Sequence, residues 1–123
     1  MSVFFQKSLR LPSYPQGYHL ITDQIEKKIP EIQDIRIGFL QVFLQHTSAG
    51  LCINENADPT VRKDFQTFIS ELIPETYPRF VHDYEGTDDM PAHIKSAFFW
   101  CQSSNTDFRW KTRLGNLAGN LPL

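Results

Sequence analysis

The apolar run I-R-I-G-F-L-Q-V-F-L-Q-H at residues 35–46 constrains the fold more than any other part of this chain. It is rich in β-branched and aromatic residues, which favour strands because their side chains pack well on a pleated surface. The run predicts one long central strand, and G-L-C-I-N shortly after it predicts a short second strand. Together with the helices described next, these strands indicate a mixed α+β domain.

Three segments have features that are typical of helices. The stretch Y-H-L-I-T-D-Q-I-E-K-K-I at 18–29 repeats apolar residues every three to four positions, and a proline ends the pattern. Asp58 and Pro59 are a good start for a second helix, because Asp caps helix N-termini and Pro is tolerated in the first turn. A third, short helix is predicted to open at Asp88 or Asp89.

Length and charge narrow the classes of protein to which the chain can belong. Its 123 residues allow a single core and are too few for a (β/α)₈ barrel, so we expect one domain. The net charge is -2 and Lys and Arg form no run, which argues against a nucleic-acid partner. No transmembrane or signal segment is visible, so we expect a cytoplasmic protein without a membrane partner. Cys52 and Cys101 have no metal or redox spacing, and Cys52 is predicted to be a buried free thiol.

Residues 45–59, Q-H-T-S-A-G-L-C-I-N-E-N-A-D-P, concentrate polar side chains behind the predicted central strand. Such groups are costly at a buried strand end unless they are paired or bind a ligand. His46 is a candidate acid, hydrogen-bond donor or metal ligand. Thr47 and Ser48 suit a phosphate oxygen, although an ST-turn explains them equally well. The candidate substrate-binding residues of this run are Thr47, Ser48, Asn54, Glu55, Asn56 and Asp58.

The last four of these residues differ in what they can do. In an extended chain Asn54 and Asn56 share one face and Glu55 points to the other. Asp58 is better explained as a helix cap than as a catalyst. Both roles can coexist, because a helix N-terminus also offers backbone donors to anions.

A second polar cluster, H-D-Y-E-G-T-D-D-M-P-A-H-I-K, occupies residues 82–95. Asp89 and His93 stand four apart and share a helix face, which suits a carboxylate that orients an imidazole. Lys95 points elsewhere on the helix and is a candidate phosphate ligand. Three histidines with one carboxylate suit a zinc-like ion, although the spacing H-x₁₀-H has low specificity. The candidate catalytic residues are His46, Asp89, His93 and Lys95, and the candidate ligands of a divalent metal ion are His46, His82 and His93.

Residues 100–123 fit no regular element, because they have neither the strand nor the helix period and contain two glycines and a proline. Residues 1–99, in contrast, resemble an incomplete domain of the YjbQ-like family, also named secondary thiamine-phosphate synthases. The motifs H-T-S-A-G-L, I-N-E-N-A-D-P and D-D-M-P-A-H-I-K carry the resemblance in order and spacing. Family members continue with a hairpin that ends close to G-T-W-Q-G-I-Y-L, and this chain does not.

A shift of the reading frame by one base accounts for that difference. Back-translated with chosen synonymous codons and read one base on, the tail gives G-V-S-L-V-I-P-I-S-D-G-K-L-G-L and then G-T-W-Q-G-I-Y, a strand–turn–strand pattern. Phe98 and Phe99 can be encoded by a run of T, where one extra base is easily inserted. We therefore predict that residues 100–123 are a frameshifted tail outside the native fold and that the C-terminal hairpin is missing.

The resemblance implies a mainly antiparallel, jelly-roll-like β-sandwich with two or three helices, assembled as a homotrimer. It also implies that hydroxymethylpyrimidine diphosphate is joined to thiazole phosphate with release of pyrophosphate, so that a small phosphorylated molecule is a partner. Two alternatives stay open. One is a metal-dependent hydrolase or lyase that activates water with its histidines. The other is a non-catalytic protein that binds a small phosphate or metabolite.

Overall fold

The computed structural model describes residues 3–99, 102–105 and 117–120. The helices are α1 (Thr22–Lys28), α2 (Pro59–Leu72) and α3 (Asp89–Phe99), with a 3₁₀-helix η1 (Pro30–Asp34) after α1. The strands are β1 (Tyr18–Leu20), β2 (Leu40–Phe43), β3 (Gly50–Ile53), β4 (Gln102–Asn105) and β5 (Leu117–Asn120). They form an antiparallel three-stranded sheet in the order β1-β5-β3 and an antiparallel pair of β2 with β4.

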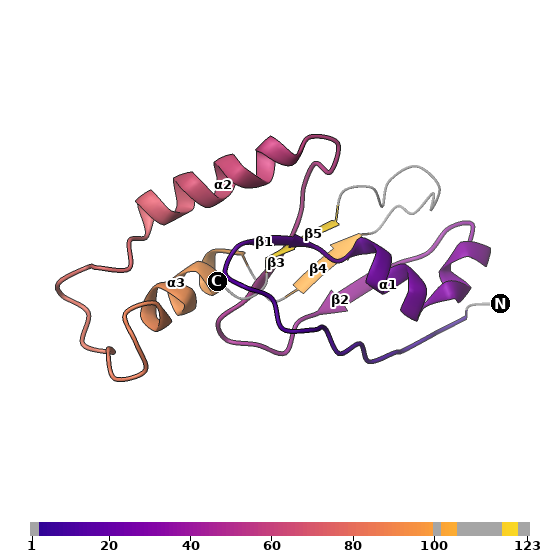
Figure 1. Ribbon diagram of the computed structural model, residues 1–123. Coiled ribbons are helices and arrows are strands. Elements are labelled where there is room, and N and C mark those ends of the chain that lie inside the picture. The colour runs from indigo at the N-terminus through magenta and orange to yellow at the C-terminus, as the bar shows by residue number, and fades with distance from the viewer. Residues whose placement is uncertain (1–2, 100–101, 106–116, 121–123) are drawn as a thin grey trace.

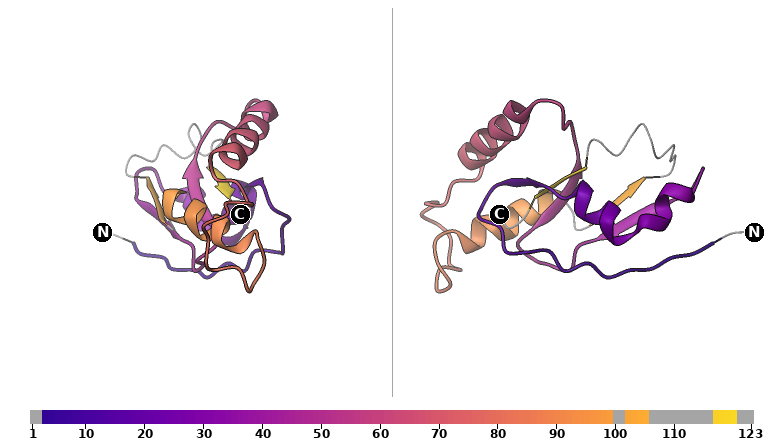
Figure 2. Two further views of the ribbon diagram at one scale, coloured as in Figure 1. Left: turned by 90° about the vertical axis from the view of Figure 1, so that its left-hand side faces the viewer. Right: turned by 45° about the vertical axis from the view of Figure 1, so that its right-hand side comes forward.

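The helices surround these small sheets unevenly. Helices α1 and η1 lie toward the N-terminal end of the molecule, whereas α3 and the loop before it lie at the opposite end (Figure 1). Helix α2 stays at the periphery in both further views (Figure 2). Its amphipathic face is accordingly incompletely covered, since Phe68 is 63% exposed and Leu72 is 58% exposed.

The core joins the first helix to the segment that precedes β3. Ile21 and Ile25 are four residues apart, so they share one face of α1 and its N-terminus. They cluster with Ile32, Ala49 and Leu51, all of them buried. Full burial of such an isoleucine contributes about 1.5–3 kcal/mol. The core therefore fixes Ala49, which directly follows the polar residues His46, Thr47 and Ser48.

Two elements differ in extent from the sequence predictions. The predicted strand at 35–46 is shorter in the structure and covers only Leu40–Phe43, where the chain finds β4 as a partner. The predicted helix at 18–29 starts at Thr22, because the preceding residues pair with β5 as strand β1. Strand pairing is a tertiary interaction and overrides local periodicity.

The mixed α+β class and the antiparallel pairing are thus confirmed. A jelly-roll-like sandwich is a finer statement that these two small sheets do not establish, and it stays a prediction.

Strands β4 and β5 both come from the segment 100–123, so the prediction that this segment fits no regular element is wrong for residues 102–105 and 117–120. The prediction that the segment is frameshifted is a separate one. The pairing of the two strands does not test it, because pairing uses backbone N–H and C=O groups that any amino-acid sequence supplies. The remaining parts of the tail, residues 100–101, 106–116 and 121–123, lie outside the described residues.

In the described ranges, none of the helices has both the length and the apolar character needed to cross a membrane.

Candidate metal site

The loop before α3 and the first turns of α3 bring three potential metal ligands together. A turn closes where the N–H of Gly86 donates to the carbonyl of Asp83 at 3.2 Å, and Gly86 has a φ of 121°. Glycine adopts this conformation without the steric cost that other residues meet. The turn folds His82 back onto α3, where Asp89 and His93 stand one helical turn apart.

The two imidazole rings converge on one carboxylate oxygen of Asp89. His82 Nε2 donates to Asp89 Oδ2 at 2.9 Å, and His93 Nε2 lies 3.3 Å from the same oxygen. The potential ligand atoms of His82, Asp89 and His93 all lie within 4.8 Å of one another, and each side chain is half-buried. Such spacing allows a single ion to contact all three.

The hydrogen bond on the other side of the His93 ring fixes its tautomer. His93 Nδ1 lies 3.1 Å from the carbonyl oxygen of Thr47. A carbonyl oxygen only accepts hydrogen bonds, so Nδ1 carries the proton and Nε2 of the neutral ring presents a lone pair. That lone pair faces the Asp89 carboxylate at 3.3 Å. A positive charge between the two atoms, either a proton or a metal ion, stabilises this arrangement.

The Asp89 carboxyl group is held in its ionised form. Burial on its own raises its pKa, but the hydrogen bond with His82 and the charge that His93 carries when its ring is protonated outweigh burial, so that the pKa of Asp89 is lower than usual. An ionised carboxylate between two imidazole nitrogens is a suitable oxygen ligand for a divalent cation.

Two further residues border the site. Glu85 Oε2 lies 3.6 Å from His82 Nε2, and the ring of Tyr84 stands edge-on to that of His82 at 4.8 Å between centroids. Both come from the loop that carries His82, so the same turn assembles the ligands and their surroundings.

His46, the third histidine of the predicted metal set, takes a different position. Its side chain is exposed, and its Nδ1 accepts a hydrogen bond from the N–H of Ser48 at 2.9 Å. Among the described residues, the group of ligand atoms within 4.8 Å contains Asp89 and does not contain His46. The contact of this segment with the site is the one between the Thr47 carbonyl oxygen and His93 Nδ1.

The residues after β3 lie outside this group. Asn54 and Asn56 are half-buried and Glu55 is exposed, an alternation that matches the expected extended chain. The Asn54 carboxamide oxygen accepts from the N–H of Glu55 at 2.7 Å. Asp58 accepts from both the N–H and the hydroxyl of Thr60 at 2.8 Å, which confirms its prediction as the cap of α2.

Lys95 is buried, with 3% of its surface exposed. It lies two positions beyond His93 on α3, so it points away from the face that carries Asp89 and His93. In the part of the chain that the structure describes, its ammonium group forms no ion pair with a carboxylate.

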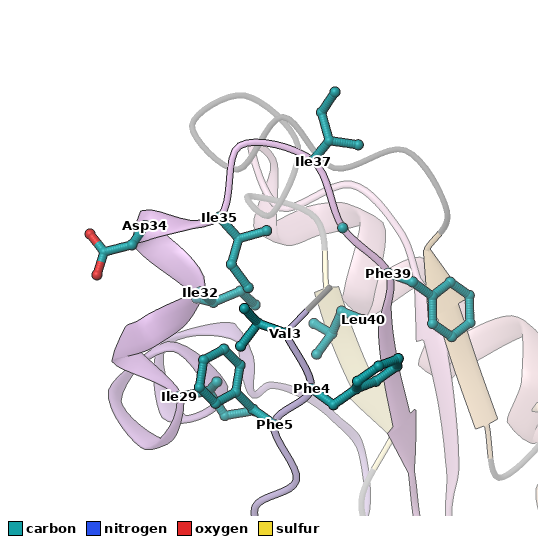
Figure 3. Close-up of a pocket in the computed structure, with 11 residues that line it drawn as sticks. Val3, Phe4, Phe5, Ile29, Ile32, Asp34, Ile35, Ile37, Phe39 and Leu40 are labelled. Carbon is teal, nitrogen blue, oxygen red and sulfur yellow. The ribbon is translucent and has the colours of Figure 1, made fainter. Parts of the chain in front are cut away.

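A cavity of about 600 Å³ lies at the other end of the molecule, between the N-terminal segment, η1 and the start of β2. Figure 3 shows aromatic and aliphatic side chains around it, with Phe4 and Phe5 on one side and Ile32 and Ile35 on another. Its lining contains Asp34 as a single titratable group. The cavity is therefore an apolar surface feature without the convergent polar groups that catalysis needs.

Comparisons with known proteins identify the family that the sequence motifs indicated. Residues 7–106 match the family described as UPF0047 protein YjbQ-like. The chain belongs to this family. UPF0047 protein YjbQ of Escherichia coli O157:H7 is 46% identical over 95 residues, which are 77% of this chain and 68% of that protein. UPF0047 protein sll1880 of Synechocystis is 40% identical over 92 residues, which are 75% of this chain and 62% of that protein.

Solved structures share the fold of this YjbQ-like chain. A conserved hypothetical protein from Thermus thermophilus superposes with a TM-score of 0.72 at 26% identity, covering 93% of this chain and 86% of that one. A hypothetical protein from Aeropyrum pernix gives a TM-score of 0.71 at 19% identity, over 92% of this chain and 85% of that one. The second likeness supports the fold alone.

These matches correct the activity that the resemblance implied. The YjbQ-like family and its matched relatives carry UPF0047 names, which assign no thiamine-phosphate synthase activity. Membership of the family therefore does not make this chain a transferase of that kind. The names do not describe an assembly either, so the expected homotrimer has no support from them.

Proposed function

We propose that this YjbQ-like domain binds one divalent transition-metal ion through His82 Nε2, the Asp89 carboxylate and His93 Nε2. The observation that carries the proposal is the convergence of two imidazole nitrogens on one carboxylate oxygen, at 2.9 and 3.3 Å. Both nitrogens already face the same oxygen, so binding requires small ring rotations that turn them from this oxygen to an ion beside it, with loss of the hydrogen-bonded proton.

The ligand set indicates which ions fit. Imidazole nitrogens favour Zn²⁺, Cu²⁺, Fe²⁺ and Ni²⁺, whereas Mg²⁺ and Ca²⁺ prefer sites made of oxygen alone. Two neutral imidazoles and one carboxylate also leave a divalent ion with a net positive charge. Three protein ligands leave at least one coordination position free for water or for an anionic oxygen of another molecule.

The turn at Gly86 supports the proposal because it brings His82 to the two ligands on α3. His82 stands seven residues before Asp89 but lies in the loop that precedes α3, so it is the turn at Gly86 and not the helix that brings it to the carboxylate. Its ring is further held by Tyr84 at 4.8 Å.

The test is a zinc titration of metal-stripped protein without a histidine tag, using a chromogenic chelator as competitor. We expect one equivalent of Zn²⁺ to bind and the Asp89→Asn variant to bind at least about tenfold more weakly, because the amide keeps the shape and loses the charge. His19→Gln is the matched control, since His19 binds the Pro15 carbonyl and belongs to no ligand group among the described residues. Equal affinities for wild type and Asp89→Asn would sink the proposal.

A further inference from the structure

We infer that His46 is a positioning residue for the metal site: its ring holds the Thr47–Ser48 turn so that the Thr47 carbonyl fixes His93 to bind through Nε2. The inference rests on the metal site proposed above. It gives His46 a role in ion binding without contact with the ion.

The first link is the hydrogen bond from the N–H of Ser48 to His46 Nδ1, at 2.9 Å. An acceptor on residue i that bonds the N–H of residue i+2 is the geometry of an Asx-turn, with the ring nitrogen in place of a carboxamide oxygen. Thr47 lies at the centre of this turn. The ring of His46 therefore determines how the peptide of Thr47 is oriented.

The second link is the hydrogen bond from His93 Nδ1 to the Thr47 carbonyl oxygen, at 3.1 Å. Metal-binding histidines commonly donate their second ring nitrogen to a carbonyl or carboxylate, which selects the tautomer and fixes the ring orientation. Here the bond leaves Nε2 of His93 unprotonated and directs it to Asp89. The two residues are 46 positions apart, so the contact depends on the docking of α3 against the segment before β3.

The other end of the same segment is anchored independently. Ser96 donates its hydroxyl to the Ala49 carbonyl at 3.0 Å, and Ala49 is fully buried in the core. His93 and Ser96 are three positions apart on α3, so they contact the segment side by side. The core thus holds Ala49, while His46 supplies the separate constraint on the Thr47 carbonyl.

The experiment compares three variants with wild type. His46→Phe keeps an aromatic ring and removes the acceptor, whereas His46→Asn restores an acceptor suited to an Asx-turn. His19→Phe is the control, because His19 Nε2 also bonds a backbone carbonyl, that of Pro15 at 2.7 Å, in another part of the fold. The measurements are the Zn²⁺ affinity, the His93 tautomer of metal-free protein by ¹⁵N NMR, and the melting temperature.

We expect His46→Phe to lower the Zn²⁺ affinity by about 10- to 100-fold, the range found for residues that support metal ligands. His93 should then populate the Nε2–H tautomer, while His46→Asn and His19→Phe keep the wild-type affinity and tautomer. If His46→Phe does not fold, Ser48→Pro removes the N–H donor instead and should have the same effect on affinity.

Three outcomes would overturn the inference. In one, His46→Phe retains the wild-type affinity and tautomer while His93→Ala loses the ion, so the metal site stands without His46. In the second, His46→Asn fails as badly as His46→Phe, which makes His46 a direct ligand. In the third, wild type binds no Zn²⁺ and the His93 tautomer is indifferent to His46→Phe. If wild type binds no Zn²⁺ but the His93 tautomer does change in His46→Phe, the proposed function is refuted. The hydrogen-bonded link from His46 to His93 then still stands.

Discussion

Asp89 shows how much of the site depends on local sequence and how much does not. Its pairing with His93 was predictable, because residues four apart on a helix share a face. His82 was named as a candidate metal ligand, but its pairing with Asp89 was not predicted, since it depends on the turn at Gly86. The spacing H-x₆-D-x₃-H with a glycine in the first gap is a signal that could have indicated this pairing. The role of His46 needs the tertiary contact between Thr47 and His93 and has no local signal.

Cys52 permits a prediction at the same scale. The residue is half-buried and not fully buried as predicted, and this partial burial raises the pKa of its thiol above the usual 9.0, so the reactive thiolate is scarce at neutral pH. In a Cys101→Ser background, we expect Cys52 to react with a disulfide reagent at pH 7 far more slowly in native protein than in urea. Equal rates in the two states, followed by absorbance of the released thiolate, contradict the burial argument.

The start of α2 is the best-defined helix boundary of the chain. Hydrogen bonds from the N–H and then the hydroxyl of Thr60 lower the pKa of Asp58. A depressed pKa stabilises the fold at pH values above 3.8, the ordinary value, and the effect is lost as pH falls through the lower folded pKa. We expect Asp58→Ala to lower the melting temperature by a few degrees at pH 7.

The same variant should cost less in acid, where the Asp58 carboxyl is protonated in both states and the charge-dependent part of the cap is lost. Thermal unfolding at a series of pH values from neutral to strongly acidic measures the difference. If the difference in melting temperature between wild type and Asp58→Ala stays the same into acid, the charge of the capping carboxylate is not the cause of that difference. Asp64→Ala, on an exposed position of the same helix, serves as the control.

The turn at Gly86 in the loop before α3 leaves little room for a side chain. A Cβ atom at Gly86 would lie 2.8 Å from Asp88 Oδ1, and the φ of 121° is strained for alanine in any case. We expect Gly86→Ala to weaken Zn²⁺ binding, because it displaces His82 from Asp89. Adding Asp88→Ala removes the steric clash and leaves the φ strain, so it should restore only part of the affinity. An unchanged affinity in Gly86→Ala would show that the turn does not assemble the site.

The start of a helix could be predicted from the sequence where its capping residue is local. The extent of a strand could not be predicted where pairing with a distant strand decides it. Asp58 marks the start of α2 in the sequence and in the structure alike. Strand β1 falls within a predicted helix because its pairing with β5 joins residues 18–20 to residues 118–120, which no local pattern encodes. The same reason shortens the predicted long strand to Leu40–Phe43.

At the scale of the whole molecule, the reading-frame proposal bears on the two sheets. In the shifted frame the positions of β4 read S-L-V-I and those of β5 read W-Q-G-I, whereas the chain as written has Q-S-S-N and L-A-G-N there. The shifted residues have far higher strand propensity and more apolar surface to bury. We propose that the frame changes within the codons of Phe98 and Phe99.

The prediction is that a gene with one base removed at this point encodes a more stable protein. Several additional buried apolar side chains should raise the melting temperature by more than about 10 °C over that of the chain as written. Calorimetry of both proteins measures the difference, and sequencing of the DNA across these codons tests its cause. A reproducible, uninterrupted frame with no extra base relative to relatives would refute the proposal.

An anomalous difference map would show whether His82, Asp89 and His93 together hold one ion. Crystals grown from protein loaded with Zn²⁺ should show a single strong peak at about 2.0–2.2 Å from His82 Nε2, an Asp89 carboxylate oxygen and His93 Nε2, with His46 outside the coordination shell. A peak centred on His46, or no peak between these three residues, would contradict the account.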